Sequence, residues 1–183
     1  MQAKVYEDKD GFIVDKDTII HLGDFACTGF DRGFKGLDIS PQVLMYRINA
    51  NFINVRGNHD CNNSVKTSCN SMQLNLGKRY PSVTAGHYPS YDRRASGYVK
   101  RGFINLCGHV HSTWRHCLDL DLQVLNINVG VDAWNFKLVS EEDVIKYIDE
   151  LLRRRPDELH RCKKNTESNK IEFFGSSKCN YRK

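Results

Sequence analysis

The chain has 183 residues, of which 40% are hydrophobic and 27% charged, a composition typical of an ordinary globular protein with one sizeable core. No apolar run approaches the roughly 20 residues of a membrane-spanning helix. The N-terminal residues are polar and acidic, without the basic and apolar regions of a signal peptide. These features exclude a membrane protein and favour a cytoplasmic one.

The net charge of +5 is unevenly distributed. Residues 153–183 hold ten Lys or Arg against four Asp or Glu, a balance of +6, and the other 152 residues hold 17 basic and 18 acidic side chains, a balance of −1. The basic character therefore belongs to the C-terminal segment. We expect residues 1–155 to form the domain and residues 156–183 to be a basic appendage.

The seven cysteines are scattered without a C-x-x-C pair. In a chain of this size, an odd number of unpaired cysteines indicates reduced thiols rather than a disulfide framework. A zinc cluster is the alternative, but the spacing matches no zinc-binding knuckle.

The first half of the chain reads as a strand, a helix and a strand. The apolar, β-branched residues 18–22 predict a buried strand that ends at Gly23-Asp24. After a glycine-rich loop, Ser40 is placed to cap a helix and Pro41 suits its first position. Residues 52–55 predict the second strand, which completes a βαβ unit.

The second half predicts further strands and one clear helix. Residues 61–79 are polar and read as an irregular excursion, with at most one short helix. The S-x-x-D box of Ser140 and Asp143 begins the clearest helix, and Pro156 ends it. Strands are expected at residues 82–85, at 103–107, once or twice within 118–131, at 136–139, and as a short piece near 171–174.

Four segments share one pattern: an apolar strand, a glycine, and then side chains that bind metals or transfer protons. Each motif alone is common in loops. However, the C-terminal ends of strands in an α/β sheet face one crevice, so residues placed there converge. Four of the seven histidines occupy these positions, and we interpret His21, His116 and His160 as structural or surface residues. The segments are Gly23-Asp24, Gly57-Asn58-His59-Asp60, Gly86-His87 and Gly108-His109-Val110-His111.

These residue types indicate a divalent metal site. Imidazole nitrogens, a carboxylate and an amide oxygen suit Mn²⁺ first, with Zn²⁺, Fe²⁺ or Ni²⁺ as alternatives, and no thiolate is needed. Asp24 has two oxygens and could bridge two ions. Two ions about 3.5–4 Å apart can hold a phosphate and activate a water. Hydrolysis of a phosphate ester is the reaction we expect.

In these motifs the sequence resembles the calcineurin-like metallophosphoesterases. The family pattern is D-x-H, then G-D, then G-N-H-D or G-N-H-E, then G-H, then G-H-x-H, and four of the five motifs occur here in that order. The resemblance covers about residues 17–147. The stretch N-V-G-V-D-A-W-N-F, residues 128–136, is similar to small bacterial and phage members.

The resemblance implies a four-layer α/β/β/α sandwich and a role for each matching residue. Asp24 is then the bridging ligand, with Asn58, His87 and His109 completing one metal's protein ligands, and His111 binding the other metal. His59 is similar to the family's catalytic histidine, which donates a proton to the leaving oxygen, and Asp60 would orient it.

The D-x-H motif is absent, because no histidine precedes His21. Two explanations remain open: a fragment that lacks its first core strand, which we favour, or a protein that works with one metal. The expected function is hydrolysis of a phosphate mono- or diester. The alternative is a catalytically impaired or non-enzymatic binding module that keeps the fold.

A weaker idea is nucleic-acid action through the basic loop 92–101 and the basic tail. The physiological substrate, a nucleotide or nucleic acid among the candidates, and the oligomeric state do not follow from the sequence.

Overall fold

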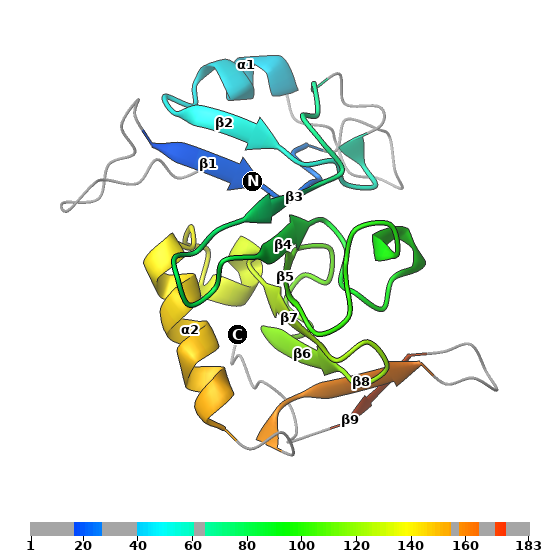
Figure 1. Ribbon diagram of the computed structural model, residues 1–183. Helices are drawn as coiled ribbons and strands as arrows, with labels where there is room; N and C mark the ends of the chain where they lie inside the picture. Colours follow the sequence, from blue (N-terminus) through cyan, green and yellow to red (C-terminus); the bar gives the residue numbers. More distant parts are fainter. Residues whose placement is uncertain (1–16, 27–39, 61–64, 155–157, 165–170, 175–183) are drawn as a thin grey trace. The chain divides into compact units, whose positions relative to one another are not determined.

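The structure is a computed structural model that describes residues 17–26, 40–60, 65–154, 158–164 and 171–174 (Figure 1). The chain forms two compact units, Met1–Met72 and Gln73–Lys183, called here the N-terminal and C-terminal units. Together the elements make a mixed α/β protein. Two predicted features lie outside the described residues. They are most of the glycine-rich loop after Asp24, within 27–39, and the end of the last helix at Pro156.

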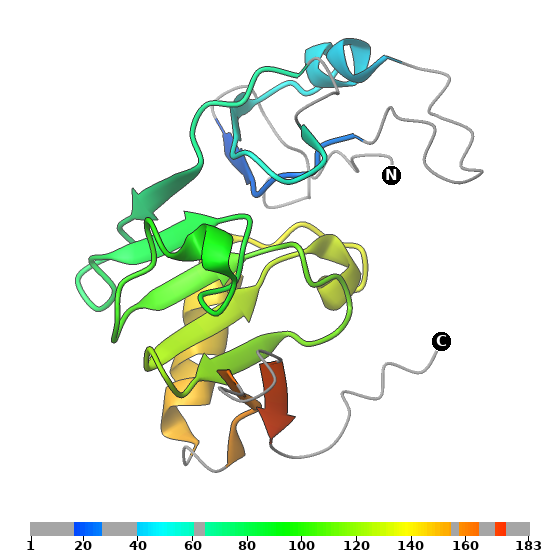
Figure 2. The ribbon, with the colours of Figure 1, turned by 90° about the vertical axis from the view of Figure 1, so that its right-hand side faces the viewer.

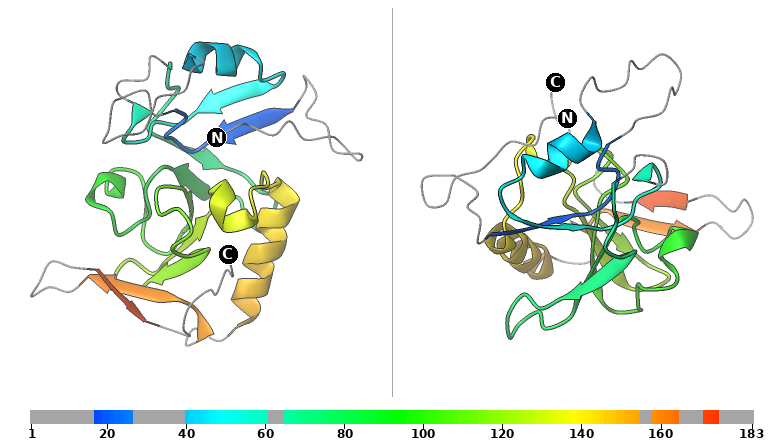
Figure 3. Two further views of the ribbon diagram at one scale, coloured as in Figure 1. Left: turned by 180° about the vertical axis from the view of Figure 1, so that it is seen from behind. Right: turned by 90° about the horizontal axis from the view of Figure 1, so that it is seen from above.

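The N-terminal unit is built on the predicted βαβ arrangement. Strand β1 (Thr18–His21) pairs in parallel with β2 (Asn51–Asn54), with Thr18 opposite Asn51 and His21 opposite Asn54. Helix α1 (Pro41–Tyr46) connects them and lies along one face of the pair (Figure 3). The predicted cap is confirmed, because the Ser40 side chain accepts the backbone N–H of Val43.

The C-terminal unit contains most of a larger sheet with the strand order β3-β4-β5-β7-β6-β8-β9. The unit boundary falls within β3. Strands β4, β5 and β7 run parallel, β6 is antiparallel to β7 and parallel to β8, and β9 is antiparallel to β8. The bounds are β3 (Ser71–Leu74), β4 (Val83–Gly86), β5 (Ile104–Cys107), β6 (His116–Asp119), β7 (Val124–Asn128), β8 (Arg161–Lys164) and β9 (Ile171–Phe174).

Helix α2 (Glu141–Arg153) lies across one face of this sheet, as Figure 2 shows. Its predicted capping box is confirmed, with the Ser140 hydroxyl and the Asp143 carboxylate each accepting from the other residue's backbone N–H. Val144, Ile148 and Leu151 form its buried side, so the helix is held by its apolar stripe. None of the helices in the described part of the chain is long and apolar enough to cross a membrane.

Buried cysteines contribute to the core of the C-terminal unit. Cys107, Cys117 and Cys162 pack with Trp114, and all three are free thiols. Burial raises the pKa of the Cys107 thiol, which keeps it protonated and unreactive.

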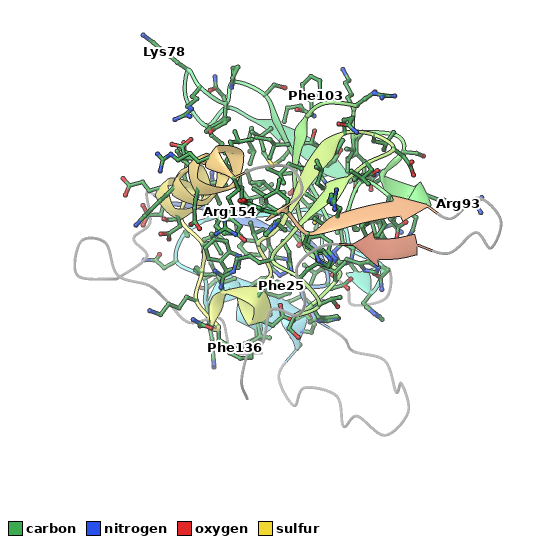
Figure 4. All side chains as sticks on the ribbon, turned by 90° about the horizontal axis from the view of Figure 1, so that it is seen from below. Phe25, Lys78, Arg93, Phe103, Phe136 and Arg154 are labelled. Atoms are coloured by element: carbon green, nitrogen blue, oxygen red, sulfur yellow. The ribbon has the colours of Figure 1, made fainter. Side chains whose placement is uncertain are left out.

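Three expectations differ from the structure. No strand forms at 136–139: η3 (Val131–Trp134), a 3-10 helix, precedes this segment, and Asn135 and Phe136 take left-handed φ values of 55° and 58°, which a strand does not allow. Figure 4 shows Phe136 at the surface beside η3. The segment 61–79, expected to be irregular, contains β3 (Ser71–Leu74).

The third difference concerns residues 156–183, which we expected to be an appendage. Instead β8 pairs with β6, and Cys162 is fully buried. The short strand expected near 171–174 is present as β9, and it extends the same sheet.

Candidate metal centre

In the N-terminal unit, Asp60 holds together the two loops that follow β1 and β2. Asp60 is only 5% exposed. It accepts the backbone N–H groups of Asp24 at 2.8 Å, Phe25 at 2.9 Å and Gly57 at 2.7 Å. Removing this carboxylate would remove the acceptor of one buried and two half-buried N–H groups. Asp60 therefore fixes the place of Asp24, a role the sequence did not predict.

Asp24 approaches the second loop closely because residue 57 is glycine. A Cβ on Gly57 would lie 2.2 Å from Asp24 Oδ1 and 2.4 Å from its backbone nitrogen. The backbone N–H of His59 donates to Asp24 Oδ1 at 2.8 Å. Asn58 is half-buried, and the His59 side chain is exposed. Asp60 and the backbone of His59 thus both hold Asp24, one through its backbone N–H and the other through its carboxylate.

In the C-terminal unit, His87 and His109 face each other. Each follows a strand, β4 and β5 respectively, and these strands are parallel neighbours, so their C-terminal ends lie at the same edge. His87 Nε2 lies 3.1 Å from His109 Nδ1. His87 is 1% exposed, whereas the His109 side chain is 27% exposed. The pair thus has one buried ring and one that reaches solvent.

His111 lies apart from this pair in its contacts. Its side chain is 82% exposed, and Nδ1 lies 3.2 Å from Asp132 Oδ2. The Asn128 side chain donates to the His111 carbonyl and to that of Trp114, which anchors the loop. Asp132 and Asn128 both belong to the N-V-G-V-D-A-W-N-F stretch, so this stretch positions His111.

Three predicted ligands have unusual backbone conformations. Asp24, His109 and His111 have φ values of 59°, 65° and 50°. Left-handed backbone costs a non-glycine residue about 1–2 kcal/mol. Such strain gathers at functional sites, where the surrounding structure maintains it.

A buried polar network supports the loop that carries His87. Asn126 Oδ1 accepts the Ser90 backbone N–H at 2.8 Å and the Asn105 Nδ2 at 3.0 Å, and the Ser90 hydroxyl donates to Asp119 at 2.7 Å. Asn105 Nδ2 also donates to the Tyr88 carbonyl. Sequence reasoning missed this network. Its signal was the asparagines within the apolar strands I-N-L-C and V-L-N-I-N.

Asp92 and Arg94 lie on the outer side of His109. Arg94 Nη2 lies 3.3 Å from His109 Nε2, and Asp92 Oδ2 lies 4.0 Å from the same atom. Burial alone would raise the pKa of the Asp92 carboxyl, but the hydrogen bonds and charge of Arg94 outweigh it and lower that pKa. Asp92 is therefore ionised and its charge is paired with Arg94.

The predicted site residues thus form two groups, one in each unit. Asp24, Asn58, His59 and Asp60 make up the first, and His87 and His109, with His111 nearby in sequence, make up the second. The donor set of carboxylate, amide and imidazole is suited to a divalent ion. No protein-family model matches the chain, and no curated protein or solved structure gives a significant match.

Proposed function

We propose that the chain is a metal-dependent phosphoesterase that hydrolyses a phosphate mono- or diester. The observation that carries this proposal is the 3.1 Å separation between His87 Nε2 and His109 Nδ1. The two imidazoles follow adjacent parallel strands, and when both of these nitrogens are deprotonated they are close enough to bind one ion. The strand-end motifs resemble those of calcineurin-like metallophosphoesterases, and this resemblance supports phosphate-ester hydrolysis as the reaction.

The histidine pair fits a bound divalent ion. With metal–nitrogen bonds of about 2.1 Å, two neighbouring ligand nitrogens lie about 3.0 Å apart in octahedral geometry and about 3.4 Å in tetrahedral geometry. The observed separation falls between these values. Mn²⁺ is the expected ion, with Zn²⁺, Fe²⁺ or Ni²⁺ as alternatives.

We take Asp24 and Asn58 as the remaining proposed ligands of this ion. The support for this choice in the N-terminal unit is the strained backbone of Asp24 and the anchoring of its loop by Asp60. A four-layer α/β/β/α sandwich is part of the same proposal. It is supported by the parallel strand pairing and the helix present in each unit.

Each site residue then has a chemical task. When bound, the ion supplies Lewis acidity and lowers the pKa of a coordinated water. His59, fixed through its backbone N–H to Asp24 and exposed at its ring, donates a proton to the leaving oxygen. Asp60 keeps the loops of Asp24 and His59 together.

A second candidate is a binding module with little or no catalysis. His111 favours this second candidate. Its ring is largely exposed and lies against the Asp132 carboxylate. A second ion would then depend on Asp24 and His111 alone, which are too few ligands to hold it tightly.

Hydrolysis of an aryl phosphate tests the first candidate. Metal-free protein is given Mn²⁺ and either p-nitrophenyl phosphate or its bis(p-nitrophenyl) diester. We expect activity that requires the metal, and a loss of about 100-fold or more in kcat for His59→Ala, because this variant lacks the proton donor. Mn²⁺ binding by the variant serves as the control and should be unchanged. A metal-independent rate, or a full rate in the variant, contradicts the proposal.

A further inference from the structure

Arg94 is held in a fixed orientation beside His109. It lies in η2 (Arg93–Ala95), a 3-10 helix whose N-cap is Asp92. Arg94 Nε donates to Asp92 Oδ1 at 2.9 Å, and Nη2 donates to Asp92 Oδ2 at 2.7 Å. The guanidinium carbon lies 4.0 Å from the centroid of the Tyr88 ring. A two-point ion pair and a stacked ring together restrict the plane of the guanidinium.

Asp92 occupies only one edge of this guanidinium. The other contacts of its two terminal nitrogens are long: Nη1 to the Tyr88 hydroxyl at 3.3 Å and Nη2 to His109 Nε2 at 3.3 Å. The Arg94 side chain is 50% exposed, whereas that of Asp92 is 18% exposed. The terminal N–H groups are therefore the part of the side chain that is open to a further acceptor.

The proposed role of His109 makes one of these N–H groups available. An arginine only donates hydrogen bonds, so His109 Nε2 accepts in this structure. If His109 Nδ1 uses its lone pair as a ligand, the neutral ring must carry its proton on Nε2. His109 Nε2 then carries a hydrogen and can no longer accept the hydrogen bond from Arg94 Nη2. This N–H of Arg94 therefore requires another acceptor.

We propose that Arg94, positioned by Asp92 and Tyr88, binds the phosphate oxygens of the substrate and determines the site's specificity for phosphate esters. This inference rests on the proposed function, because the phosphate is placed next to the ion held by His87 and His109. A guanidinium matches two phosphate oxygens with parallel N–H bonds. Arg94 is the described residue that brings such a group against His109.

Titration calorimetry of the full chain tests this role with two ligands, Mn²⁺ and then inorganic phosphate on the Mn²⁺-loaded protein. The variants are Arg94→Ala, Arg94→Lys and, as the matched control, Arg93→Ala. Arg93 is the neighbouring residue in η2, and its exposed side chain projects outward (Figure 4). We expect Arg94→Ala to weaken phosphate binding about tenfold or more and to leave Mn²⁺ affinity within about twofold.

The other variants separate charge from geometry. Arg94→Lys keeps the charge but loses the two-point contact, so its phosphate affinity should fall between those of the wild type and Arg94→Ala. Arg93→Ala should bind both ligands like the wild type.

Three results would overturn the inference. Unchanged phosphate affinity in Arg94→Ala that still binds Mn²⁺ rejects it and leaves the proposed function standing. Parallel loss of Mn²⁺ and phosphate binding shows that Arg94 only supports His109. A wild-type chain that binds no divalent ion rejects the proposed function together with this inference.

Discussion

Gly57 determines how closely the loop after β2 can approach Asp24. A Cβ on residue 57 would lie 2.2 Å from the carboxylate oxygen Oδ1 of Asp24 and 2.4 Å from its backbone nitrogen, which is too close for either atom. Backbone atoms cannot move aside as the end of a long side chain can. Asp24 also takes a left-handed φ of 59°, which the hydrogen bond from its backbone N–H to Asp60 helps to maintain. Adding a methyl group at residue 57 therefore tests whether the loops after β1 and β2 must approach each other this closely.

We predict that Gly57→Ala displaces Asp24 and weakens Mn²⁺ binding about tenfold or more. Hydrogen exchange measured on peptides covering residues 17–26 should also become faster, because the hydrogen bonds to Asp60 loosen. Gly97→Ala is the matched control, since a Cβ there meets nothing within 4 Å. Equal metal affinity and equal exchange in Gly57→Ala and the wild type would show that Asp24 is not held in this way.

Site residues that directly follow a strand could be predicted from the sequence. The residues that hold these site residues in place could not. His87 and His109 were expected to meet because parallel strands end at one edge, and their ring nitrogens do meet. The link from Ser90 to Asn126 spans 36 positions and has no local signal. The placement of Arg94 against His109 likewise depends on how an irregular loop folds. Such contacts are set by tertiary packing rather than by periodicity.

His116 connects β6 to helix α2 as a neutral imidazole. Its Nδ1 lies 2.8 Å from the Tyr147 hydroxyl, and its Nε2 accepts the backbone N–H of His160 at 3.3 Å. Burial, with smaller contributions from His160 and from nearby Arg154 and Arg115, lowers its pKa from 6.5 to about 4. The folded C-terminal unit thus takes up this proton at a much lower pH than the unfolded chain does.

We predict that the C-terminal unit loses about 1 kcal/mol of unfolding free energy between pH 7 and pH 5.5 through His116. In this window the unfolded chain binds the proton and the folded unit does not, so stability falls as pH falls. Urea unfolding followed by tryptophan fluorescence is the measurement. Both tryptophans, Trp114 and Trp134, lie in this unit.

His116→Asn is the corresponding variant, and it should show a smaller pH dependence. A remainder is expected because burial also lowers the pKa of His160. The same loss of stability in the variant and the wild type would exclude His116 as its source.

Elements with strong local signals were predicted well. The caps at Ser40 and Ser140 and the parallel pairing of β1 with β2 are confirmed. The strand expected at 136–139 is wrong because the backbone at Asn135 and Phe136 is left-handed. Strand β8, R-C-K-K, was missed because its sequence is mostly basic and only its pairing with β6 reveals it.

At the scale of the whole molecule, the chain divides at Met72 and Gln73, and this boundary has no compositional signal. Each unit places chemically active residues just after parallel strands: Asp24 and His59 in one, His87 and His109 in the other. We propose that the two groups serve one metal-dependent reaction. Residues of both units would then contribute to the affinity for the same ion.

Native mass spectrometry combined with Mn²⁺ titration tests that claim most directly. The wild type, Asp24→Ala and His109→Ala are compared at equal concentrations, with Gly97→Ala as the control and circular dichroism as the check of folding. We predict that the wild type binds Mn²⁺ and that each single variant loses most of this binding. A wild-type protein that binds no ion, or an Asp24→Ala variant that binds as tightly as the wild type, would contradict the account.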